Sequence, residues 1–260
     1  MKKEWSGKKT AAVICGCLGA GIILLVTFYI SVFQLVRGVL ALERKYGGNI
    51  ASEYYEFHNE VKNNLSYQVR FEDYEEKFGD SKNISVDIAY PVVYGKDDFT
   101  AVNKIIQKEI GKVKSYVESV AGQLGKSEEF EFDGECYVTY MDEELLSIIY
   151  VEYGYLNDEV YESYVVSVNI DMDSKMALTN TQLLDIDDEF SIDFRERCEK
   201  QNGSIELLNY YSDQNITQML TSEEHLIIFY TPLGMEVGFN YYGVWVTVTY
   251  RDYGKYQKQL

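Results

Sequence analysis

Residues Ile84–Val120 read ISVDIAYPVVYGKDDFTAVNKIIQKEIGKVKSYVESV, and this stretch contains the clearest secondary-structure pattern beyond the N-terminal segment. In its first part, Ile84–Val92, apolar residues alternate with other residue types, which predicts a strand with one buried face. The second part opens with Asp97-Asp98, whose side chains can cap a helix, and then repeats apolar residues every three or four positions. This spacing predicts an amphipathic helix of about six turns.

A series of strands is predicted after this helix. A polar loop, Gly122–Gly134, precedes a hairpin whose strands are Tyr137–Met141 and Leu145–Tyr155, and a further strand covers Tyr164–Asp171. A helix followed by an antiparallel meander is the element order of an α+β domain. The patterns therefore predict a first α+β subdomain over residues 83–171.

The second half repeats this mixture of helices and strands, which predicts a second α+β subdomain over residues 172–260. In its last strand, Val244–Tyr250, valines and a tyrosine at the even positions alternate with Trp245 and two threonines at the odd positions. One face of this strand is therefore expected to pack on the helices. The expected elements are a strand at Met176–Thr179, helices at Phe190–Gln201 and Ile205–Leu220, and strands at His225–Tyr230, Met235–Asn240 and Val244–Tyr250.

The N-terminal part contains an uncharged apolar stretch, Thr10–Val36. As a helix, its 27 residues would exceed the ~30 Å hydrocarbon core of a bilayer, so we expect a single transmembrane helix. The alternative is a cleaved signal peptide, whose apolar region is shorter, about 7–15 residues. Lysines before the stretch place residues 1–9 in the cytoplasm as a short tail, and the rest of the chain outside the cell membrane. Residues 37–82 are expected to form a juxtamembrane stalk with a short helix near Ala51–Val61.

The charge of the chain excludes one class of partner. The formal net charge is −18, and from Arg37 onward 41 acidic residues face 20 basic residues. Such a surface repels nucleic acid and other anionic polymers, and it attracts a basic partner. A second interpretation is that the charge serves solubility alone.

Familiar catalytic motifs do not occur in the sequence, which has no Walker loop, no GxGxxG, no HExxH and no GxSxG. With His58 and His225 as the only histidines, neither a zinc site nor a cofactor is expected. We therefore expect no enzyme activity, and the sequence assigns no catalytic or ligand-binding residue. Cys136 and Cys198, the only cysteines after the apolar stretch, could form a disulfide in an oxidising compartment, and the sequence leaves their pairing open.

Two acidic segments, Asp171–Ser174 and Asp185–Glu189, contain oxygen ligands that could bind calcium. Neither has the spacing of an EF-hand. Asp and Ser at such positions usually bond to the local backbone, so turns and a helix cap are the favoured interpretation.

Three strings, together with the helix after the first, resemble a known family. They are SVDIAYPVVYG (Ser85–Gly95), YVVSVNIDMDSKMALTNTQLL (Tyr164–Leu184) and LIIFYTPLGMEVGFNYYGVWVTVTY (Leu226–Tyr250). They resemble the paired extracytoplasmic domains of lysozyme-sensing Gram-positive anti-sigma factors and the non-catalytic N-terminal module of a class of peptidoglycan deacetylases. The resemblance implies an α+β ectodomain outside a membrane anchor. The resemblance implies neither sigma-factor binding nor deacetylase activity, because the domains that perform them have no counterpart in these residues.

Three functions are consistent with these features. The first is a membrane-anchored, extracytoplasmic binding or sensing domain for a cell-wall component or a cationic protein such as lysozyme. The second is a cell-wall hydrolase, which would need two carboxyl groups in an enclosed cleft, at least one with a raised pKa. The third is a structural envelope protein that joins a larger complex through an exposed patch rich in tyrosine.

Overall fold

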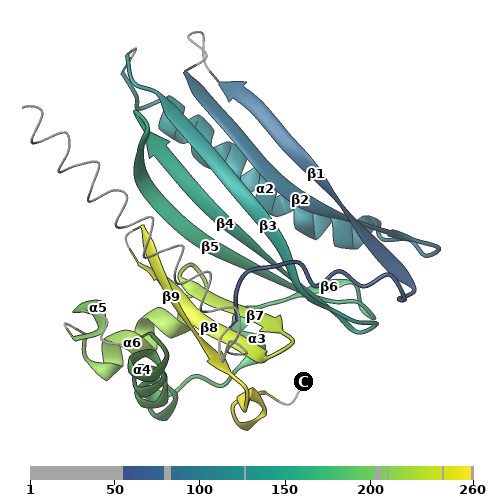
Figure 1. Ribbon diagram of the computed structural model, residues 1–260, viewed down its shortest axis with the longest axis vertical. Helices are drawn as coiled ribbons and strands as arrows, with labels where there is room; N and C mark the ends of the chain where they lie inside the picture. Colours follow the sequence, from purple (N-terminus) through teal and green to yellow (C-terminus); the bar gives the residue numbers. More distant parts are fainter. Residues whose placement is uncertain are drawn as a thin grey trace, which may run out of the picture. The chain divides into compact units, whose positions relative to one another are not determined.

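The computed structural model describes residues 55–78, 83–125, 127–202, 206–209, 211–241 and 243–258 (Figure 1). All of them belong to one compact unit, Tyr54–Leu260. Within these ranges, every helix is too short or too polar to cross a membrane. The membrane helix expected at Thr10–Val36 lies outside the described residues.

The first part of the unit is a six-stranded sheet with strand order β1-β2-β3-β4-β5-β6. Every neighbouring pair is antiparallel except β2 and β3, which are parallel. The α+β prediction is confirmed, and the strands expected after the helix form an antiparallel meander in β3, β4 and β5. The expectation that all strands are antiparallel is wrong, because the pairing of β2 with β3 makes the sheet mixed. The strands are β1 (Tyr67–Phe78), β2 (Ile84–Gly95), β3 (Phe130–Met141), β4 (Leu145–Leu156), β5 (Glu159–Asp171) and β6 (Met176–Leu178).

The parallel pair results from the helix between its strands, α2 (Thr100–Ala121). A helix of 22 residues is about 33 Å long, which is enough to return the chain to the end of the sheet where β2 began. The next strand must then run in the same direction as β2. The aspartate cap expected at Asp97-Asp98 does not form, because Phe99 occupies the N-cap position and no side chain caps the helix. Asp98 lies one residue earlier, where its Oδ1 accepts a local hydrogen bond from the Thr100 amide at 2.9 Å. The helix covers one face of the sheet and buries its apolar stripe there (Figure 1).

Strand β1 occupies residues that were expected to be stalk. Tyr67–Phe78 pairs with β2 along its whole length, and the described residues 55–61 are not helical. The alternation of β1 was obscured because both of its faces carry charged residues, although Tyr67 and Phe78 at its two ends are buried in the core. On the helix side, Glu76 binds Lys114 of α2 at 2.8 Å, so charged side chains take the place of apolar ones.

The second part of the unit is a three-stranded antiparallel sheet, β7-β8-β9, packed against helices. As predicted, β9 directs Val248 and Tyr250 to the helices and Trp245 to the opposite face. The elements are α3 (Asn180–Leu183), α4 (Asp188–Asn202), α5 (Glu206–Asn209), α6 (Asp213–Thr221), β7 (Leu226–Thr231), β8 (Gly234–Tyr241), β9 (Val244–Tyr250) and the short 3-10 helix Tyr253–Lys255.

The two sheets are joined along the edge of β5. Asn240 of β8 bonds both backbone groups of Val165, at 2.9 Å to the amide and 2.8 Å to the carbonyl. Asn169 of β5 donates in return to the carbonyl of Ile228 at 2.8 Å. Side-chain amides thus replace a neighbouring strand along this edge. The two sheets therefore belong to one packed unit. The strand at Met176–Leu178, which the sequence assigned to the second subdomain, pairs with β5 in the first sheet.

Candidate functional site

The face of the six-stranded sheet opposite α2 is strongly acidic. Alternate residues of β1, β2 and β3 point to this face, which lies toward the viewer in Figure 1. We call its carboxylates the acidic face: Asp73, Glu75, Asp87, Glu131, Asp133 and Glu135. Among the described residues, none of these carboxylates forms an ion pair.

Strand register places like charges on directly opposite positions of neighbouring strands on this face. Glu75 is the cross-strand partner of Asp87, and Asp87 is in turn the partner of Asp133. Like charges directly opposite each other destabilise a sheet by up to about 1 kcal/mol per pair. The pKa of Asp133 is raised, first by its partial burial and then by the charges of Glu131 and Asp87. The fold therefore retains an unfavourable row of charges on an open surface.

Tyrosines continue this row into β4. Tyr153 is the cross-strand partner of Asp133, and its ring centroid lies 6.3 Å from that of Tyr155. Both tyrosines are half-buried. A surface that combines carboxylates with rigid amphipathic rings can bind a basic protein through ion pairs and apolar contacts together.

A cavity of about 570 Å³ lies on the other side of the sheet, between α2, strands β4 and β5, and the segments around β7 and β8. We call it the Glu152 pocket. Its walls include Val113, Tyr116, Phe132 and Val166. Glu152 of β4 points into this cavity from the sheet and is only 7% exposed. Burial raises the pKa of its carboxyl group to about 8.

Two acids near Glu152 already have partners. Glu109 forms an ion pair with Lys112 at 2.6 Å. The buried Glu162 accepts a hydrogen bond from the hydroxyl of Tyr116. Glu152 itself accepts no hydrogen bond from any described residue. One buried carboxyl group is therefore left without a partner.

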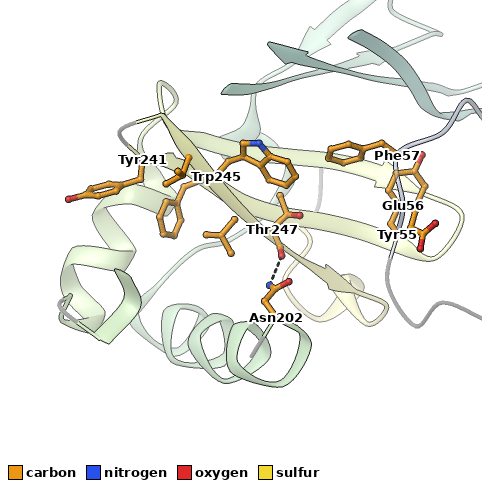
Figure 2. A pocket seen from close by; sticks show the side chains of 10 residues that line it. Tyr55, Glu56, Phe57, Asn202, Tyr241, Trp245 and Thr247 are labelled. Carbon is orange, nitrogen blue, oxygen red and sulfur yellow. Dashed lines mark hydrogen bonds between the residues drawn. The ribbon is translucent and has the colours of Figure 1, made fainter. Parts of the chain in front are cut away.

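A second hollow, of about 650 Å³, lies beside β9 (Figure 2). Its surface is mainly apolar and aromatic, and Phe57 packs on Trp245 with ring centroids 5.4 Å apart. At its base the side-chain amide of Asn202 donates to the Thr247 carbonyl at 3.0 Å. Glu56 is the only charged residue that lines it among the described residues. This hollow offers shape and apolar surface but no arrangement of reactive groups.

The residues considered in the sequence are placed as follows. Cys136 and Cys198 are free, buried thiols in two different core clusters. Asp171 Oδ1 accepts from the Ser174 amide at 2.7 Å, and Asp187 Oδ1 accepts from the Phe190 amide at 2.8 Å. The interpretation as turn and helix cap is therefore confirmed for both acidic segments.

Comparison with known proteins gives similarity in fold. No protein-family model matches the chain, and no curated protein matches it. The chain is similar in fold to proteins of the DUF3298 family. A member of that family from Bacteroides fragilis aligns with a TM-score of 0.46 and 9% identity over 78% of this chain and 96% of its own. A DUF3298 protein from Pseudomonas aeruginosa aligns with a TM-score of 0.42 and 10% identity over 72% of this chain and 90% of its own.

The sequence contained a signal for Glu152 that was not used. Glu152 is the only charged residue in β4, LLSIIYVEYGYL, and a lone acid in a largely apolar strand is expected to be buried or to line a cavity. The acidic face carried a weaker signal. Asp87 and Asp133 stand at the outward positions of their strands, but their contact depends on the register, which the helix between them sets.

Proposed function

We propose that this protein is an extracytoplasmic binding module that captures a cationic protein on its acidic face. The main support is the row of like charges formed by Glu75, Asp87 and Asp133, which the strand register places on neighbouring strands. A sheet gains nothing in stability from such a row. A partner with lysines or arginines at matching positions would relieve the repulsion on binding.

Charge also supports the choice of partner. With 41 acidic against 20 basic residues from Arg37 onward, the field of the protein accelerates encounter with a basic protein and repels nucleic acid. The resemblance to lysozyme-sensing ectodomains points to the same class of ligand. The proposed setting is the outer surface of the cell membrane, with Thr10–Val36 as the anchor.

The experiment measures the affinity of the full chain for a cationic lysozyme at two ionic strengths, about 0.01 M and about 0.1 M, where the Debye length is roughly 30 Å and 10 Å. We expect binding at the lower ionic strength that weakens at the higher one. A triple variant, Glu75→Gln with Asp87→Asn and Asp133→Asn, should bind at least about tenfold more weakly, equivalent to about 1.4 kcal/mol.

The matched control removes the same charge elsewhere, with Asp173→Asn, Glu196→Gln and Glu199→Gln, all exposed outside the acidic face. It should retain most of the affinity. Equal losses in both triple variants would assign the effect to net charge alone. Absence of wild-type binding at low ionic strength would remove the proposal.

The hydrolase alternative is less well supported by the Glu152 pocket. Glu152 has the raised pKa that a general acid needs, but catalysis also requires a second carboxyl group free to act. Glu109 is held by Lys112, and Glu162 by Tyr116. The remaining acid at the cavity, Glu224, is exposed to solvent, so no second enclosed carboxyl group that is free to act faces Glu152 among the described residues. Release of peptidoglycan fragments by the wild type, lost in Glu152→Gln, would reverse this preference.

A further inference from the structure

The Glu152 pocket has the size and composition of a small-molecule site. Its volume, about 570 Å³, falls within the range of about 300–1,000 Å³ typical of ligand pockets. Its open surface is mainly apolar and aromatic, and the polar residues that line it are Glu109, Lys112, Glu152, Glu224, His225 and Asn240. It lies on the opposite side of the sheet from the acidic face, so the two sites are independent.

Glu152 is the feature of this pocket that packing does not explain. Its neighbours on the same face of β4, Ile148 and Tyr150, belong to the apolar core, where an apolar residue would also fit position 152. A carboxylate in a largely buried position costs free energy unless a partner compensates its charge. Glu152 is buried, lines the cavity and accepts no hydrogen bond from any described residue. A ligand that supplies the missing donor would recover this cost.

The charged residues around the cavity determine which ligand charge it favours. Glu109 and Glu162 both act electrostatically against a charge on Glu152, and Lys112 acts in its favour. The Lys112 ammonium is bound to Glu109 at 2.6 Å and is largely exposed. The interior of the pocket is therefore negative, and an anionic ligand would be repelled.

Aromatic walls complete the recognition. Tyr116 and Phe132 lie against each other, with ring centroids 5.8 Å apart, and Tyr164 lines the cavity beside Glu152. Aromatic faces attract cations and also bury apolar groups. One end of a ligand can thus pair with the carboxylate while its body packs on the rings.

We propose that the Glu152 pocket binds a small organic cation, with a primary ammonium group paired to the carboxylate of Glu152 and a compact apolar or aromatic body packed against Tyr116, Phe132 and Val166. Binding is non-covalent. This site is a second binding activity beyond the capture of a cationic protein.

The test titrates three primary ammonium probes, 2-phenylethylamine, benzylamine and cyclohexylmethylamine, into the full chain in detergent, with heats of binding as the readout. At least one probe should bind saturably. Its neutral alcohol counterpart should bind at least about tenfold more weakly, because it lacks the charge that pairs with Glu152. Absence of saturable binding by all three probes, or equal affinity for amine and alcohol, would overturn the proposal.

Two variants test whether the probes bind in the Glu152 pocket. Glu152→Gln should abolish the preference for the amine, and Val166→Phe should weaken all probes by filling the cavity without a change in charge. The matched control is Glu236→Gln on β8, since Glu236 is also buried but accepts a hydrogen bond from the hydroxyl of Thr249 and lies outside the pocket. It should bind the probes as the wild type does. Unchanged amine binding by Glu152→Gln would exclude this carboxylate as the recognition group.

Discussion

Glu152 shows how one residue can conflict with the strand that contains it. Its strand is otherwise apolar and central in the sheet, and the protein places there a carboxyl group with no described partner. The sequence could reveal this residue as unusual but could not show the cavity. Residues from α2, β5 and the segment before β7 form the walls, and only the tertiary fold brings them together.

The protonation of Glu152 leads to a prediction about stability. Burial raises its pKa from 4.5 to about 8, so between these values the folded protein keeps a proton that the unfolded chain releases. The free energy of unfolding should therefore fall as pH rises through this window and level off above about 8. Glu152→Gln removes the cost. It should raise the free energy of unfolding at pH 8 by a few kcal/mol, at about 1.4 kcal/mol per pKa unit, and should have little effect near pH 4.

Denaturant unfolding at several pH values checks this prediction. The control is Glu199→Gln, which removes an exposed carboxylate of α4 and should leave the pH dependence of the wild type in place. A variant at position 152 with the same stability as the wild type at both pH values would show that the buried carboxyl group imposes no cost.

At the scale of elements, the sequence patterns predicted individual strands and helices but did not predict how the strands pair. The helix α2, the strand β2 and the three closing strands follow directly from apolar periodicity. The parallel pairing of β2 with β3 was missed because periodicity describes one element at a time. Strand β1 was missed because ion pairs and hydroxyl contacts, such as that between Tyr90 and Glu72, occupy its helix side.

The edge of β5 gives a prediction at this scale. In Asn240→Ala the amide and carbonyl of Val165 lose their partners, and each buried group left unpaired costs about 1–3 kcal/mol. We expect a loss of a few kcal/mol in the free energy of unfolding, together with faster hydrogen exchange at the Val165 amide.

Asn103 provides a matched control for this edge. Its side chain bonds both backbone groups of Val93, each at 2.8 Å, within the first half of the unit. Asn103→Ala should also destabilise the protein, but exchange at Val165 should stay slow. Similar exchange at Val165 in both variants would mean that Asn240 does not hold the two sheets together.

At the scale of the whole described unit, the two sheets should unfold together. Besides Asn240, the buried hydroxyl of Ser147 accepts from the Tyr230 amide at 3.0 Å, and the side chains of Ile149 and Val151 pack on those of Ile227 and Phe229. Because these contacts are buried between the two sheets, unfolding of one half would remove packing contacts from the other half. We expect a single cooperative transition.

Unfolding followed by far-UV and by near-UV circular dichroism tests this expectation, since the two signals report the backbone and the packing of the tyrosines. Coincident curves are expected for the wild type. Two separated transitions would show that the halves are independent domains.

The outer position of β1 has a consequence for how molecules of this protein meet each other. β1 is a terminal strand of the six-stranded sheet, and one of its two edges has no partner strand in the described structure. Such an edge is a template on which another copy could add a strand. The charges at Asp73 and Glu75 repel an identical strand, so the carboxylates proposed to attract a basic ligand would also keep neighbouring copies from joining edge to edge.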